Sequence, residues 1–140
     1  MVSIYLTDVH ILATAAARKK TSALATFLRS DLSKVPLLVL TVATEETSDL
    51  KLVMRSASCN NLPIKVLGMG RKWKGFWQKI ALLREELERH KNNADLMIVY
   101  VDGSDSLFTT GAVEIAQKFH KFRAKIVFSA EEFWRYSPAK

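Results

Sequence analysis

From residue 35 onward, continuous apolar runs alternate with segments of helical periodicity. The run VPLLVLTVAT, residues 35–44, is apolar and rich in β-branched residues, which predicts a strand buried on both faces. Shorter runs predict further strands at 64–67, 96–101 and 125–129. Between the strands, apolar residues recur every three or four positions, which predicts three helices.

Each predicted helix has an apolar face that we expect to pack on the sheet. The residues expected on these faces are Leu50, Val53, Met54 and Ala57 in the first helix, Phe76, Ile80, Leu83 and Leu87 in the second, and Ile115, Ala116, Phe119 and Phe122 in the third, which opens near Thr110. On the exposed side of the second helix, Glu85 stands four residues before Arg89 and is placed to pair with it. Strands alternating with helices at this spacing predict an α/β fold with a parallel sheet and helices on both faces.

Residues 1–34 do not fit this alternation. The segment IYLTDVHILATAAA resembles a secretory leader, but Asp8 and His10 interrupt its apolar run and no basic residue precedes it. We therefore predict an N-terminal extension of unknown role at 1–34, followed by the α/β domain at 35–140. No stretch reaches the roughly 18 apolar residues that a membrane span needs.

The composition supports a folded domain with a basic surface. Of 140 residues, 49% are hydrophobic and 25% charged, which is enough apolar material for one core. The formal net charge of +7 would attract phosphate, nucleic acid or acidic surfaces. The basic residues form separate clusters at 18–20, 71–79 and 118–125, and no nucleic-acid motif accompanies them, so we interpret them mainly as solvated helix faces.

The cysteine and histidine residues do not indicate a metal framework. Cys59 is the one cysteine, which excludes an intrachain disulfide and a Cys-based zinc site, and we expect it to be buried. His10, His90 and His120 lack metal-ligand spacing, and we place the last two on helix surfaces near C-terminal turns.

The stretch IVYVDGSDSLF, residues 98–108, carries the strongest candidate chemistry. Asp102 and Asp105 follow a predicted strand, and in parallel sheets ligands bind beyond the carboxyl ends of the strands. Two carboxylates across a Gly-Ser turn can converge on a hard divalent cation, which in turn can hold a diphosphate. The same D-x-x-D spacing also suits a turn held by Asx hydrogen bonds, so spacing alone leaves both interpretations open.

Several segments, taken in order, resemble one known family. LLVLTVATEET, LGMGRKW, the pair QK, DLMIVYVDGSDSLF and IVFSAEE are similar to the N-terminal glycosyltransferase domain of the procollagen lysyl hydroxylases, over roughly residues 36–134. The resemblance implies a Rossmann-like, partial GT-A-type fold that uses manganese and a UDP-sugar to glycosylate hydroxylysine in collagen. It also implies a location in the endoplasmic reticulum, for which this N-terminus carries no convincing signal.

The resemblance implies roles for particular residues. Asp102 and Asp105 match the metal-binding aspartates of the family. The residues that match its UDP-sugar site are Val42 and Thr44 at the uridine, Trp73 near the sugar, and Lys79 at phosphate or sugar oxygens. Glu131 matches the SAE segment and is as readily structural as catalytic.

The departures from the family affect catalysis more than donor binding. Ser104 stands where the family usually has a tyrosine that stacks on the base, and KGFW replaces a longer glycine-rich stretch before QK. The chain ends at Lys140, and we expect the later half of the family's domain, with a histidine of the metal shell, to have no counterpart in it. We expect apolar surface left uncovered there to favour self-association or a partner.

Three functions therefore remain open. The first is a collagen-type glycosyltransferase domain that binds a UDP-sugar through Asp102 and Asp105, with doubtful turnover in this 140-residue form. The second is a non-catalytic remnant that serves as an interaction module. The third is a basic domain that binds phosphate or nucleic acid.

Overall fold

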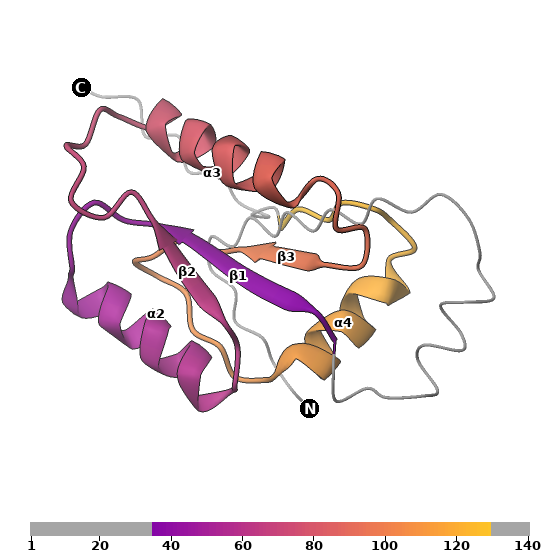
Figure 1. Cartoon of the computed structure of the whole chain (residues 1–140). Helices are drawn as coiled ribbons and strands as arrows, with labels where there is room; N and C mark the ends of the chain where they lie inside the picture. The colour runs from indigo at the N-terminus through magenta and orange to yellow at the C-terminus, as the bar shows by residue number, and fades with distance from the viewer. Residues whose placement is uncertain (1–34, 130–140) are drawn as a thin grey trace, which may run out of the picture.

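The structure is a computed structural model that describes residues 35–129, in which three strands and three helices alternate (Figure 1). The strands are β1 (Leu37–Val42), β2 (Ile64–Leu67) and β3 (Met97–Tyr100). The helices are α2 (Ser48–Cys59), α3 (Trp77–His90) and α4 (Ala112–Lys121). The predicted N-terminal extension and Glu131 lie outside the described residues.

The sheet is parallel, with strand order β2-β1-β3. In the register, Val42 lies opposite Leu67 on one side, and Leu40 lies opposite Tyr100 on the other. Figure 1 shows α3 on one face of the sheet and α2 with α4 on the other. The predicted α/β, Rossmann-like fold with helices on both faces is confirmed.

Each face of the sheet has its own hydrophobic core. Val39 and Val99 point toward α2 and α4, where they pack with Val53, Ala57 and Phe119. On the opposite face, the core formed with α3 contains Leu40, Val42, Leu67, Leu82, Leu83, Ile98 and Tyr100. The central strand β1 is therefore buried from both sides, as its uninterrupted apolar sequence requires.

Local sequence signals fix the ends of α2. The Thr47 hydroxyl accepts a hydrogen bond from the Leu50 amide at 3.1 Å, which caps the helix N-terminus. After the C-cap residue Asn60, Asn61 takes a left-handed conformation with φ of 54°, which asparagine tolerates better than most residues. The chain then turns directly into β2.

Several sequence predictions about burial are wrong. Met54, Phe76, Ile80 and Phe122 are 38%, 77%, 57% and 64% exposed, and Cys59 is also exposed. Phe76 precedes the first turn of α3 and lies before the helix residues that pack on the sheet. Cys59 lies two residues beyond the buried Ala57, so its side chain turns away from the sheet.

The inward stripe of α3 is displaced from the predicted one. Leu82, Leu83 and Glu86 are its buried residues, and Leu87 packs against the same core. The pattern was misjudged because the buried position 86 carries a carboxylate, which a search for apolar periodicity passes over. The predicted pair of Glu85 and Arg89 is confirmed, with 2.5 Å between Oε1 and Nη2.

The predicted strand at 125–129 does not form within the described part of the chain. Val127 packs against the core of α2 and α4, but its neighbours Ile126 and Phe128 are 45% and 59% exposed. The apolar run is present, yet a strand also needs a paired neighbour for its backbone groups. None of the helices in the described range 35–129 has the length and apolar character to cross a membrane.

Candidate functional site

The candidate aspartates, Asp102 and Asp105, follow β3. This strand pairs with β1. From β1 the chain moves to β2 on one side, and it then crosses over to β3 on the other. The carboxyl edge between β1 and β3 is therefore the point at which strand order reverses, where open parallel sheets bind ligands. The Val101 amide donates to the Leu40 carbonyl at 3.0 Å, so Asp102 emerges at this edge.

Gly103 allows the loop after β3 to approach β1 closely. A Cβ atom added there would lie 3.1 Å from Thr41 Oγ1 and 3.5 Å from the Val42 carbonyl oxygen. A larger residue would therefore fit only if its neighbours gave way by a few tenths of an ångström. The glycine thus sets the position of Asp102 relative to Val42.

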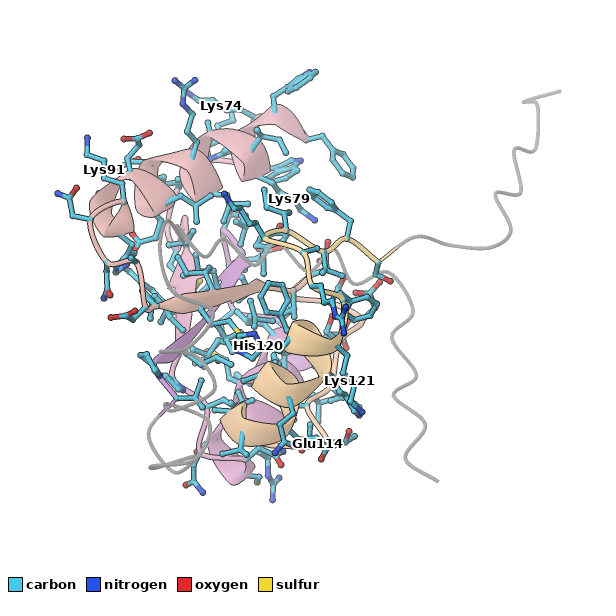
Figure 2. All side chains as sticks on the ribbon, turned by 90° about the vertical axis from the view of Figure 1, so that its right-hand side faces the viewer. Lys74, Lys79, Lys91, Glu114, His120 and Lys121 are labelled. Carbon is cyan, nitrogen blue, oxygen red and sulfur yellow. The ribbon has the colours of Figure 1, made fainter. Side chains whose placement is uncertain are left out.

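Asp102 is bound on both of its carboxylate oxygens. Oδ2 accepts a hydrogen bond from Lys79 Nζ, and Oδ1 accepts one from Ser104 Oγ at 3.2 Å. The side chains of Lys79 and Asp102 are 20% and 29% exposed. Figure 2 labels Lys79 below the N-terminal part of α3, on the side that faces the sheet. The first turn of α3 and the end of β3 are joined by this ion pair.

Asp102 carries its negative charge at neutral pH. Burial raises the pKa of its carboxyl, but the hydrogen bonds and charge of Lys79, together with Ser104, outweigh burial and hold the pKa below the ordinary value of 3.8. Burial and the nearby Asp102 charge raise the pKa of Tyr100 to about 12, so its phenol stays neutral. The edge of the sheet therefore presents one fixed carboxylate paired with one ammonium.

The other predicted residues surround this pair at different depths. Val42 is only 5% exposed and packs in the core beneath α3, while Thr44 lies just beyond β1, where its carbonyl accepts from the Gly70 amide at 2.9 Å. Trp73 is 44% exposed in the loop from β2 to α3, and Ser104 and Asp105 are exposed after β3. Hydrogen bonds join Lys79, Asp102 and Ser104 directly. The Val42 backbone lies close to Gly103, the residue after Asp102. Trp73 remains on the outer loop.

A basic pocket opens beside α3, next to the same loop. Its lining residues are Arg71, Lys72, Lys74, Gln78, Ala81, Leu82 and Glu85. The Gln78 side chain accepts from the Lys74 amide at 2.7 Å, which ties this loop to the first turn of α3. Positive charge therefore collects at the end of α3 from which Lys79 reaches Asp102.

Comparison with known proteins identifies the family. Residues 33–137 match the family described as the PLOD GT domain. The chain belongs to this family. It is 44% identical over 103 residues to procollagen-lysine,2-oxoglutarate 5-dioxygenase 1 of Homo sapiens, an overlap of 69% of this chain and 14% of that protein. It is 38% identical over 107 residues to the multifunctional procollagen lysine hydroxylase and glycosyltransferase of Caenorhabditis elegans, over 69% of this chain and 15% of that protein. The chain thus spans about one seventh of the length of these relatives.

Two residues of this PLOD GT domain were not predicted to act at the site. Gly103 was treated only as part of a turn, although a glycine between a strand and an aspartate is a recognisable sign of close backbone approach. Phe76 was assigned to the core, but its ring centre lies 5.3 Å from Lys79 Nζ. Its spacing of three residues before Lys79 was the available signal, because such residues share one side of a helix.

Proposed function

We propose that this PLOD GT domain binds the diphosphate of a UDP-sugar through a divalent cation at Asp102 and Asp105. The observation that carries the proposal is the ionised Asp102 beside Lys79 at the reversal point of the sheet. A divalent cation binds to a carboxylate, and a diphosphate binds to positive charge. Here the carboxylate of Asp102 follows β3 and the ammonium of Lys79 comes from α3. The family membership supports the same interpretation.

The residues present fit a hard cation such as Mn²⁺. Asp102, Ser104 and Asp105 offer carboxylate and hydroxyl oxygens, the ligand type that such cations prefer. No group of three or more His, Cys, Asp or Glu side chains gathers within residues 35–129, so water and diphosphate oxygens would complete the coordination. A bound cation would supply Lewis-acid neutralisation of the leaving diphosphate.

The chain's own residues divide the remaining tasks. Lys79 binds a phosphate or sugar oxygen, and Thr44 and the backbone of Val42 border the uridine. Trp73 offers an exposed aromatic face toward the sugar end of the donor. Ser104 orients Asp102 through its hydrogen bond, and it supplies a hydroxyl where a stacking ring is expected.

The acceptor and the compartment are further parts of the proposal. The C. elegans relative is named as a multifunctional procollagen lysine hydroxylase and glycosyltransferase, which supports a collagen-like acceptor carrying hydroxylysine. The location we propose, the endoplasmic reticulum, rests on the family resemblance alone. Sugar transfer to hydroxylysine is the reaction that this donor site would serve.

Calorimetric measurement of UDP binding tests the proposal. We expect UDP to bind the wild-type chain with Mn²⁺ and to lose at least about tenfold in affinity with EDTA, because the cation bridges protein and diphosphate. Asp102→Asn and Asp105→Asn should cause a similar loss. Asp95→Asn is the matched control, since Asp95 is exposed at the opposite end of β3. Equal UDP affinity with and without Mn²⁺ would refute the proposal.

A transfer assay separates an enzyme from a binding module. Radiolabelled UDP-galactose and UDP-glucose would be incubated with hydroxylysine-containing collagen peptides and the chain. Label on the peptide that disappears in Asp102→Asn indicates a transferase. UDP binding without transfer indicates the interaction module.

A further inference from the structure

The ion pair between Lys79 and Asp102 joins two groups that the proposed function assigns to different partners. Asp102 is a cation ligand in that proposal and Lys79 is a phosphate ligand, yet here each neutralises the other. The pair is more enclosed than the surface pairs of the same domain. Lys51 and Glu46 are 62% and 58% exposed, against 20% and 29% for Lys79 and Asp102. Water and salt therefore screen the Lys79–Asp102 attraction less.

Resting on the proposed function, we propose that Lys79 is a resident counter-ion that must leave Asp102 before a divalent cation can bind there. The lysine ammonium occupies Oδ2, one of the two oxygens that Asp102 can offer. An ammonium that stays in place also repels a dication at the same carboxylate. Lys79 thus opposes the binding of a cation alone.

A diphosphate removes this opposition because it gives Lys79 a second anion to bind. The lysine stem is flexible and its ammonium is a compact charge with three donors, so the group can move from carboxylate to phosphate without a change in the backbone. The Phe76 ring lies 5.3 Å from Nζ and offers favourable contact to an ammonium near the start of α3. Cation and diphosphate therefore favour each other's binding through Lys79, and the site resists loading by a cation alone.

A purely structural lysine predicts a different result. If Lys79 only fastens α3 to the end of β3, its removal loosens the Asp102 loop and leaves cation affinity unchanged or weaker. If Lys79 competes with the cation, its removal strengthens the binding of the cation alone. The sign of the change in Mn²⁺ affinity separates these two roles.

The experiment measures Mn²⁺ binding with and without UDP, using the electron paramagnetic resonance signal of free Mn²⁺. Lys79→Met removes the charge and keeps the stem, and we expect it to bind Mn²⁺ alone about five- to tenfold more tightly than wild type. The enhancement of Mn²⁺ affinity by UDP should fall by a similar factor, since coupling is reciprocal. Lys79→Gln should act like Lys79→Met, and Lys79→Arg should retain the wild-type behaviour.

Lys65→Met is the matched control, because Lys65 also binds a carboxylate, that of Glu86, through a contact of 2.6 Å. It should leave Mn²⁺ affinity unchanged, with circular dichroism confirming that each variant is folded. If wild type binds Mn²⁺ and UDP together but neither neutral Lys79 variant binds Mn²⁺ more tightly, this inference is overturned and the proposed function stands. If wild type shows no Mn²⁺-dependent UDP binding, both are overturned.

Discussion

Replacement of Glu86 by glutamine tests the charge buried beneath α3. The Glu86 side chain is 2% exposed, and its oxygens lie 2.6 Å from Lys65 Nζ, 2.9 Å from Arg89 Nη1 and 3.1 Å from His90 Nε2. Hydrogen bonds to charged groups contribute roughly 1.5–3 kcal/mol and neutral ones roughly 0.5–1.5 kcal/mol. Because Lys65 and Arg89 are about half exposed, solvent weakens their bonds to the charged carboxylate. The difference between a bond to Glu86 and the same bond to a neutral glutamine is then about 1 kcal/mol for each bond. Glu86→Gln should therefore lower the free energy of unfolding by about 2 kcal/mol at pH 7.

The pH dependence of this loss follows from the pKa of Glu86. Burial raises that pKa, but Lys65, His90 and Arg89 together lower it by more than burial raises it. The pKa of Glu86 in the folded state therefore lies below the ordinary value of 4.5. A lowered folded pKa gives stability that is complete above the unfolded pKa and is lost as pH falls through the folded pKa. The difference between wild type and Glu86→Gln should accordingly be full at pH 7 and shrink below about pH 4.5.

Urea denaturation followed by far-ultraviolet circular dichroism, at pH 7 and at pH 3, measures both effects. The control is Glu85→Gln, because Glu85 also pairs with Arg89 but is 50% exposed. Exposed pairs contribute about 0.5 kcal/mol, so this variant should differ little from wild type. Equal losses in the two variants at pH 7, or a Glu86→Gln loss that does not change with pH, would refute the reasoning.

Two further predictions concern the turn after β2 and the phenol beside the site. Gly68→Ala should cost about 2–4 kcal/mol by urea denaturation, because Gly68 has φ of +90° and an added Cβ would lie 2.8 Å from Leu82 Cδ1. Gly70→Ala meets only the backbone strain of φ +75° and should cost about 1–2 kcal/mol, and an equal loss in both variants would exclude the Leu82 clash. Absorbance titration should show a Tyr100 phenol that ionises at about pH 12, absent in Tyr100→Phe and shifted downward in Asp102→Asn. Because this folded pKa is raised, the associated stability is complete below pH 10 and declines as pH rises toward 12, whereas ionisation of Tyr100 near pH 10 would contradict its burial.

The sheet was predictable because its strands are buried on both faces. Such strands are uninterrupted apolar runs, and those at 35–44, 64–67 and 96–101 contain β1, β2 and β3. The run at 125–129 has the same composition but no strand in the structure. An apolar composition indicates that a segment is buried. A strand must also pair with a neighbouring strand, and the sequence of one segment does not show whether such a neighbour is present.

The helix faces were less predictable because burial of charge follows no apolar pattern. Glu86 occupies a position on α3 that apolar periodicity alone assigns to solvent. It is buried because Lys65 of β2 reaches it across the layers, and this contact joins residues 21 positions apart. The pair of Lys79 and Asp102, 23 positions apart, was missed for the same reason. Sequence placed Asp102 at the end of a strand, but only the fold brings the first turn of α3 over it.

The same placement changes the meaning of the basic composition. Lys74 and Lys121 belong to different layers, one beside α3 and the other on α4 (Figure 2). In the α4 cluster, Lys118 is paired with Glu114 at 2.8 Å. A nucleic-acid face requires charges that follow one backbone, and the two basic clusters within residues 35–129 belong to different layers. Arg71, Lys72 and Lys74 line a pocket beside the first turns of α3, and Lys79 of the same helix pairs with Asp102. These charges would attract the diphosphate of the proposed site at long range, while their assignment to solvated faces stays a prediction.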